Sequence, residues 1–207
     1  MVGLVPYNKL MHWLDPSYIV KTFGYVGIFT IIFLESGIPI GFFLPGDSLL
    51  FAAGLLCSQH YLNIFVVMLL AIVAAILGNN AGYLTGKKTD DAWLQKSNSG
   101  VFSKKRINEA HDFFDQRGGQ ALVLARFIPA VRTFVPIVAG IGKMDYRHFL
   151  VFNGLGALLW GITLPALGYT IGKSVPNIDK YILPVVFIFV VISSLPIVYH
   201  FLKTRRG

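Results

Sequence analysis

Four ionisable side chains stand inside stretches of sequence that are otherwise apolar and rich in glycine and proline. Glu35 and Asp47 lie in the first such stretch, and Arg126 and Arg132 lie in the second. A charge at the centre of a membrane helix costs about 2.5–3.5 kcal/mol on an insertion scale. Charges kept at that cost serve by default in ligand binding, ion coupling or ion pairing.

Because one stretch holds the acids and the other the arginines, we expect the two stretches to have different chemical roles. Arginine carries a fork of donors that fits phosphate and stays protonated at any depth, so Arg126 and Arg132 are candidates for binding a substrate phosphate. Glu35 in an apolar cavity could take up and release a proton, which makes it a candidate for proton coupling. Asp47 is the second such candidate, although its place after Pro45-Gly46 would also suit a helix cap. The alternative for all four is a structural salt-bridge network between the stretches.

Weaker candidates lie elsewhere in the apolar sequence. Asn79 and Asn153 are secondary site candidates, although asparagine in a membrane helix more often holds helices together. Trp160 is expected to pack rather than to bind a ligand. The five histidines are scattered without metal-ligand spacing, so we expect neither a metal nor a cofactor. The motifs of serine hydrolases, zinc proteases, phosphate loops and dinucleotide sites are missing from the sequence, and we expect no enzyme.

The composition indicates the class of protein that must position these residues. Of 207 residues 55% are apolar and only 14% are charged, whereas a soluble domain carries about 25% charged residues. This excludes a soluble enzyme, a disordered chain and a soluble nucleic-acid-binding protein. The excess of 18 Lys and Arg over 10 Asp and Glu is then typical of loops beside anionic lipid. The single cysteine excludes an intramolecular disulfide.

Three stretches are long and apolar enough to cross a bilayer as helices, which takes about 20 residues. They are residues 62–86, 147–172 and 180–202. Residues 1–34 are expected to form an interfacial or short membrane segment. Within it, the stretch 18–34 is short and interrupted by a lysine, so its composition leaves open whether it spans.

Two further apolar segments, residues 35–54 and 120–142, contain too many glycines and prolines for a continuous helix. Broken backbone at membrane depth survives only where protein or water satisfies its polar groups, so we expect re-entrant helical hairpins in both. Between them lies the hydrophilic stretch 87–119, whose apolar residues recur at helical spacing and predict an amphipathic surface helix. With two re-entrant hairpins, this loop and the C-terminus share one side, which holds most of the basic residues and is therefore cytoplasmic.

The sequence also repeats itself at an offset of 86 residues. Ala53-Gly54 matches Ala139-Gly140, and the pattern Gly-Tyr-x-x-Gly-Lys at 82–87 recurs at 168–173. Because each copy holds an odd number of crossings, the copies are inverted. We predict an all-α polytopic membrane protein of two inverted repeats, each a re-entrant helical hairpin plus a transmembrane helix, with an additional C-terminal transmembrane helix. The alternative is duplicated packing alone, and we expect the repeated glycines to have a structural role.

Four groups of residues carry a family resemblance. They are Glu35 with Phe43-Leu44-Pro45-Gly46-Asp47; Ala125-Arg126-Phe127-Ile128-Pro129-x-x-Arg132-Thr133-Phe134; Ala139-Gly140 with Met144-x-Tyr146-Arg147-x-Phe149; and Asn153-x-x-Gly156-Ala157-x-x-Trp160. Together they resemble the DedA family, which is also described as DedA/SNARE-associated or VTT-domain membrane proteins. The resemblance covers the core at 35–173 and implies a fold with two opposed re-entrant hairpins.

The resemblance also implies a function. Bacterial members of the family are associated with transport in the inner membrane that depends on proton-motive force, with undecaprenyl phosphate, the carrier of cell-wall precursors, as the lipid substrate. The family's functional acids fall on Glu35 and Asp47, and its functional arginines fall on Arg126 and Arg132. One departure is Asn79, where relatives often carry aspartate.

The expected protein is therefore a flippase of a lipid phosphate in the bacterial inner membrane, with a cytoplasmic C-terminus. Its expected partners are a membrane lipid (a polyprenyl phosphate or a phospholipid) and protons, without nucleic acid. Homo-oligomerisation is left open. Other readings also stay open at this point: a small-ion or drug/proton antiporter, a phospholipid scramblase, and a membrane scaffold that transports nothing.

Overall fold

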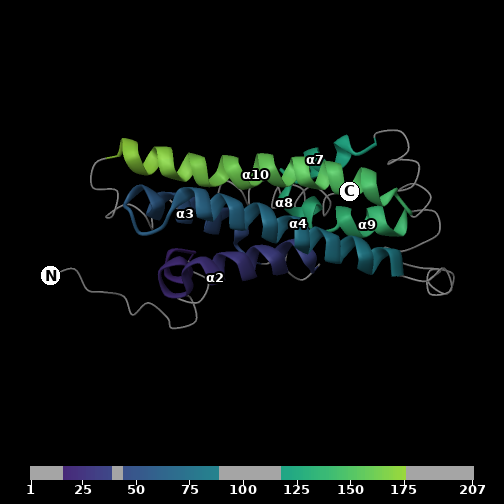
Figure 1. Cartoon of the computed structure of the whole chain (residues 1–207), viewed down its shortest axis with the longest axis horizontal. Helices are drawn as coiled ribbons and strands as arrows, with labels where there is room; N and C mark the ends of the chain where they lie inside the picture. The colour runs from purple at the N-terminus through teal and green to yellow at the C-terminus, as the bar shows by residue number, and fades with distance from the viewer. Residues whose placement is uncertain (1–15, 39–43, 89–117, 176–207) are drawn as a thin grey trace, which may run out of the picture. The chain divides into compact units, whose positions relative to one another are not determined.

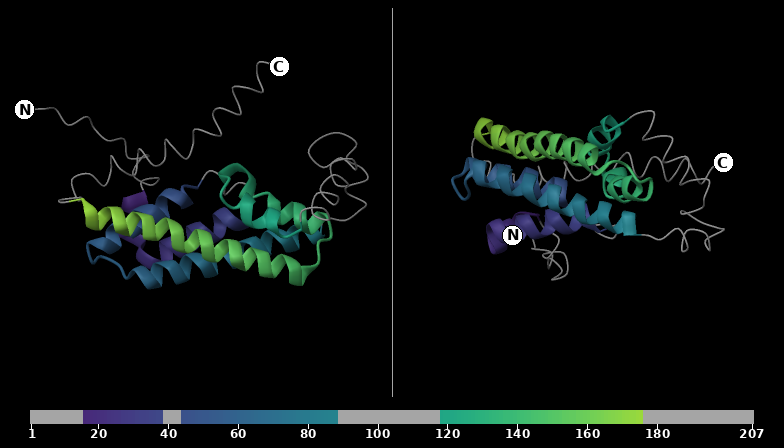
Figure 2. Two further views of the ribbon diagram at one scale, coloured as in Figure 1. Left: turned by 90° about the horizontal axis from the view of Figure 1, so that it is seen from above. Right: turned by 45° about the vertical axis from the view of Figure 1, so that its right-hand side comes forward.

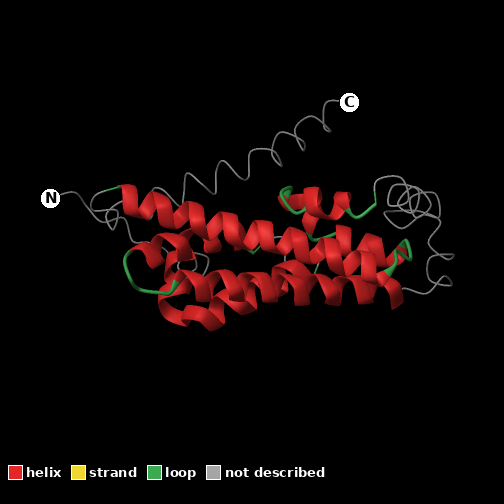
Figure 3. Cartoon of the chain, turned by 45° about the horizontal axis from the view of Figure 1, so that its top comes forward, coloured by secondary structure: helices red, strands yellow, loops and turns green. Residues whose placement is uncertain are grey.

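A computed structural model of the chain describes residues 16–38, 44–88 and 118–175. Every regular element in these ranges is a helix (Figure 3). The helices are α2 (Pro16–Gly37), α3 (Gly46–Ser58), α4 (Ile64–Lys88), α7 (Gln120–Ala125), α8 (Pro129–Arg132), α9 (Val135–Ile141) and α10 (Tyr146–Ser174). The predicted amphipathic helix after Lys88, the predicted span at 180–202 and the first 15 residues lie outside the described residues.

Two helices are long and apolar enough to cross a membrane (Figure 1). They are α4 with 25 residues and α10 with 29, which confirms the long apolar helices predicted at 62–86 and 147–172. Large apolar side chains on both helices are exposed, among them Phe65 and Leu69 on α4 and Val151 and Leu159 on α10. Such faces are compatible with a lipid environment, because contact between lipid tails and leucine or phenylalanine side chains has no free-energy cost.

Helix α2 continues across the boundary between residues 34 and 35 at which the sequence suggested a change from an interfacial segment to a hairpin. Glu35 therefore stands in the last turn of a 22-residue helix. The helix is irregular at Gly24, whose φ of 53° lies in the left-handed region that only glycine adopts without strain. Residues 39–43, which follow α2 in the sequence, lie outside the described residues.

By its internal contacts the chain divides into two compact units, of which the first holds α3 and the second half of α10. Helix α3 is buried along almost its whole length. A Cβ atom added to Gly54 would overlap the carbonyl oxygen of Pro165, and one added to Gly168 would overlap that of Phe51. The two helices thus meet backbone to backbone, which only glycine permits.

The second unit holds the end of α2, most of α4, the first half of α10 and the segment between them. This segment is broken into α7, α8 and α9, which lie beside the first half of α10 (Figure 2). The breaks match the prolines: Pro129 begins α8, and Pro136 is the second residue of α9. A proline is tolerated in the first turn of a helix and not in its interior, so the predicted interruption of 120–142 is found.

Helix α9 packs on α4 through the same kind of contact as in the first unit. A Cβ atom on Gly140 would overlap the Tyr83 carbonyl oxygen, and one on Gly86 would overlap the Ile137 carbonyl oxygen. Beside this contact the ring of Tyr83 stacks on that of Phe149 with 4.4 Å between centroids. The packing role expected for the repeated glycines is therefore found at Gly86 and Gly168.

Replacing Gly140 by alanine is expected to destabilise the protein. The new methyl group has no space against the α4 backbone, and overpacking of this kind costs about 1–3 kcal/mol. The matched control is Gly154→Ala, because a Cβ at Gly154 on α10 has nothing within 4 Å. We expect a lower thermal unfolding midpoint in detergent for Gly140→Ala only, and equal midpoints would contradict the close packing.

Candidate functional site

Three of the four predicted charged residues and both predicted asparagines come together in the second unit. Glu35 is supplied by the last turn of α2, Asn79 by the middle of α4, and Asn153 by α10. Arg126 directly follows α7, and Arg132 is the last residue of α8. Both arginines therefore stand at the breaks that the prolines impose on the segment.

Arg132 and Glu35 form an ion pair. Their side chains are only 10% and 4% exposed, respectively. Charges buried to this degree are stable only when they are paired. The pairing of opposite charges between the two breaker-rich stretches, which the sequence suggested, is found for these two residues.

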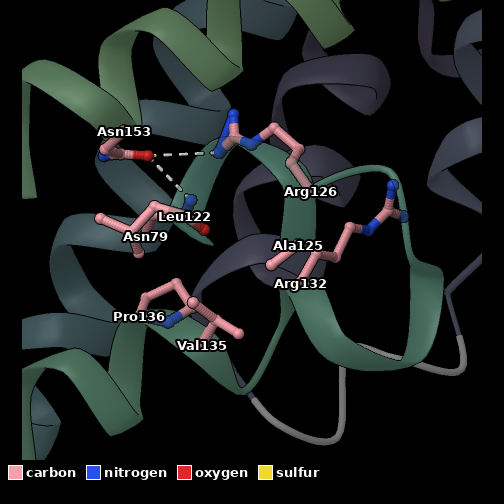
Figure 4. Close-up of a pocket in the computed structure, with 8 residues that line it drawn as sticks. All are labelled: Asn79, Leu122, Ala125, Arg126, Arg132, Val135, Pro136 and Asn153. Carbon is pink, nitrogen blue, oxygen red and sulfur yellow. Dashed lines mark hydrogen bonds between the residues drawn. The ribbon is translucent and has the colours of Figure 1, made fainter. Parts of the chain in front are cut away.

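Arg126 is buried as well, at 5% exposure, but its partners are neutral. Its Nη2 donates to the Asn153 side-chain oxygen at 3.3 Å, and the Asn79 amide nitrogen donates to the same oxygen at 2.8 Å (Figure 4). Turning the Asn79 amide by 180° would instead let it accept from Arg126 and donate to the Ser36 carbonyl oxygen at 3.1 Å. Both orientations connect the two asparagines and Arg126 in one network.

The charge of Arg126 is not balanced by an acid. Among the described residues no carboxylate pairs with it, and its Nη1 is buried without a hydrogen-bond partner. Gly156 lies beside the side chain, and a Cβ there would stand at an ordinary contact distance of 3.5 Å from the Arg126 Cδ. A buried guanidinium with a donor to spare has the chemistry to bind an anion.

Trp160 contacts both arginines, although the sequence predicted only a packing role for it. The guanidinium carbons of Arg132 and Arg126 lie 5.0 and 5.8 Å from the Trp160 ring centroid, within the range of cation–π contacts. Trp160 follows Asn153 by seven residues, which is two helical turns, so both project from one face of α10. That spacing is the signal by which the sequence could have assigned Trp160 to the site.

Two small cavities meet at this cluster. Both are lined by Asn79, Arg126 and Arg132. One continues between α7, α9 and α10 to Leu122, Ala125, Val135, Pro136 and Asn153 (Figure 4). The other is lined in addition by Ser36 and Trp160. The arginines therefore face space on two sides.

Asp47 belongs to the first unit, so the structure does not group it with the other three charges. It is the second residue of α3, and Pro45 occupies the N-cap position. Asp47 is therefore in the first turn of the helix and is not itself the N-cap residue. Its carboxylate in the first turn is instead favoured by the helix dipole. Among the described residues no three His, Cys, Asp or Glu side chains gather as a metal site would require.

The fold and the site together define a class: an all-helical membrane protein with two long apolar helices and buried charges between its helices. Residues 44–170 match the family model of the VTT domain. The chain is 38% identical to Protein DedA of Escherichia coli K12 over 185 residues, which are 88% of this chain and 84% of that protein. The chain belongs to the DedA family of VTT-domain membrane proteins.

Two further relatives extend the comparison. Inner membrane protein YqjA of Escherichia coli K12 is 34% identical over 198 residues, covering 88% of this chain and 87% of the relative. An uncharacterized membrane protein of Mycobacterium leprae is 36% identical, covering 91% and 86%. No solved structure matches the chain at a significant level.

Proposed function

We propose that the chain is a flippase that moves a lipid phosphate across the inner membrane in dependence on proton-motive force. Its proposed substrate is undecaprenyl phosphate, which would be recycled for cell-envelope synthesis. The observation that carries this proposal is the buried guanidinium of Arg126, which has neutral partners and an unpartnered Nη1 among the described residues. Leaving a buried charge without a counter-ion costs several kcal/mol, and a phosphate would supply the missing charge.

A lipid fits this site better than a free anion does. The segment that carries the arginines exposes large apolar side chains near them, namely Phe127, Ile128, Val131 and Phe134. An apolar chain could lie against these residues while its phosphate reaches Arg126, so that both parts of an amphipathic substrate are matched. Asn79 and Asn153 would hold the Arg126 guanidinium in place, and Trp160 would hold both guanidinium groups.

Glu35 offers a way to couple this binding to protons. In the structure its carboxylate pairs with Arg132. A phosphate bound at Arg126 would compete for Arg132, and the displaced carboxylate would then take up a proton. We propose Asp47 as the second proton-coupling residue, in accordance with the family resemblance.

The proposed transport needs a fold that opens to both faces of the membrane. We propose that 35–54 and 120–142 are re-entrant hairpins of two inverted repeats, that a further transmembrane helix follows at 180–202, and that the C-terminus is cytoplasmic. The contacts of the repeated glycines support this proposal, because the helix with Gly54 packs on the long helix of the second repeat and the helix with Gly140 packs on that of the first. Inverted repeats that meet around a central site are typical of secondary transporters.

The experiment is translocation of undecaprenyl phosphate by the purified chain in proteoliposomes, with and without a proton gradient. We expect movement of the polyprenyl phosphate to exceed that of phosphatidylglycerol and to stop when a protonophore collapses the gradient. Equal movement of both lipids would favour the scramblase. Movement without dependence on the gradient would overturn the coupling, and no lipid movement together with gradient-driven ion flux would favour the antiporter.

A further inference from the structure

Gly82 is a glycine for which the structure shows no steric need. Three glycines recur at every fourth position of α4: Gly78, Gly82 and Gly86. A Cβ on Gly78 would come too close to the α2 backbone, and one on Gly86 would overlap the Ile137 carbonyl oxygen. A Cβ on Gly82 would meet side-chain carbons of Ile137 and Pro136 at 3.5 Å and the Gly37 carbonyl oxygen at 3.7 Å, all of which are ordinary contact distances. Alanine would fit there and would favour the helix.

The matching glycine of the other repeat is tightly packed. The offset of 86 residues relates Gly82 to Gly168 and Ile137 to Phe51. In the first unit a Cβ on Gly168 would overlap the Phe51 carbonyl oxygen. Phe51 and Gly168 are therefore in backbone contact in the first unit. Their counterparts in the second unit, Ile137 and Gly82, are not, because the Ile137 carbonyl lies against Gly86, one helical turn further along α4.

A second pair of positions shows the same displacement. Gly54 meets the carbonyl oxygen of Pro165 in the first unit, and the repeat relates Pro165 to Asn79. Its counterpart Gly140 meets Tyr83, which is four residues beyond Asn79. Both contacts compare α9 on α4 with the equivalent pair, α3 on α10. Relative to that pair, α9 is displaced by one helical turn toward the C-terminal end of α4.

We infer that α9 slides along α4 by one turn between two registers, and that Gly82 is the glycine that the second register requires. The second register is the one that α3 already holds on α10, in which the Ile137 carbonyl would lie against Gly82 and Gly140 would lie against Asn79. One-turn displacements of packed helices are an established type of conformational switch. The inference rests on the inverted repeats of the proposed function.

The displacement would connect the contact of α9 with α4 to the candidate site. Asn79 bonds to Asn153, which in turn accepts a hydrogen bond from Arg126. In the second register Gly140 would lie against the backbone carbonyl of Asn79, and a shift of Arg126 relative to Asn153 would break the hydrogen bond between them. The segment that carries both arginines would move with α9 by about 5.4 Å along α4. The phosphate site would therefore change both its position and its hydrogen bonds in a single step.

The test compares Gly82→Ala with Gly154→Ala, a matched exchange on a long apolar helix at a position with open space. Spin labels are placed at Val73→Cys on α4 and Phe134→Cys at the start of α9, both at exposed positions, in a Cys57→Ala background. Because the second register brings α9 toward the N-terminal end of α4, its distance distribution should be shorter by about 5 Å.

We expect two distance populations in the parent and in Gly154→Ala, and only the longer one in Gly82→Ala, whose thermal unfolding midpoint should be unchanged or higher. Translocation by Gly82→Ala should fall at least tenfold. A single distance in the parent, or two populations in Gly82→Ala, would overturn the inference. The distance measurement needs no substrate, so two registers in a protein that moves no lipid phosphate would count against the proposed function and not against the sliding helix.

Discussion

Exchanging Arg126 for methionine is expected to abolish binding of the lipid phosphate and yet to leave the unoccupied protein at least as stable as before. The exchange removes a buried charge that no described carboxylate balances, and with it the desolvation penalty that such a charge carries in the folded protein. Each lost charge-assisted hydrogen bond to the phosphate costs about 1.5–3 kcal/mol, which weakens binding about tenfold or more.

Two measurements on the same sample check this expectation. Native mass spectrometry gives the binding of undecaprenyl phosphate against phosphatidylglycerol, and the thermal midpoint in detergent gives stability. Arg126→Lys keeps the charge but loses the fork of donors, so its binding should be intermediate. Arg147→Lys, at an exposed position on α10, serves as the matched control and should bind as the parent does.

Arg132 provides the internal contrast for Arg126. Its removal breaks the buried ion pair with Glu35, which typically costs 3–5 kcal/mol. Arg132→Met should therefore lower the thermal midpoint, and adding Glu35→Gln should recover much of the loss. If Arg126→Met lowered the midpoint as far as Arg132→Met does, Arg126 would be a structural residue and the anion site would be refuted.

Glu35→Gln is expected to separate binding from transport. Without the carboxylate the phosphate no longer competes with Glu35 for Arg132, so affinity for undecaprenyl phosphate should rise by about tenfold. Translocation driven by a proton gradient should fall by at least the same factor, because the step that takes up the proton is lost. Binding assays and proteoliposome flux on one preparation measure both quantities.

The pH dependence has a definite sign. Protonating Glu35 releases Arg132, so binding by the parent should tighten as pH falls, whereas binding by Glu35→Gln should lack this component. The variant also serves as the control for titration of the lipid, because the phosphate's own second ionisation near pH 6 affects both proteins equally. Parallel pH profiles for the two proteins would mean that Glu35 does not couple protons to binding.

Sequence reasoning located the charged cluster because the cost of burying a charge is independent of the fold. It predicted that acids of one breaker-rich stretch would meet arginines of the other, and the pair of Glu35 and Arg132 agrees. It located the breaks in the second stretch because proline acts locally on the backbone. The two long apolar helices followed from length and hydropathy alone.

Other features depend on contacts that no local pattern encodes. The ring of Trp160 reaches Arg132 across elements 28 residues apart in the chain, and only the packing of α8 beside α10 reveals it. The continuity of α2 through Glu35 was hidden because glycines and prolines begin two residues later. That Arg126 has neutral partners and Arg132 a charged one could not be assigned from two arginines six residues apart in one motif.

The packing of α3 has a consequence for the synthesis of the chain. The backbone that Gly54 contacts, at Pro165, is made about 110 residues after it. At 5–20 residues per second the ribosome needs roughly 5–20 s to deliver that partner. During this interval the face of α3 around Gly54 lacks its partner from α10, and the helix can persist because it satisfies its own backbone groups. The contact between α3 and α10 therefore forms only after the second half of α10 has been synthesised.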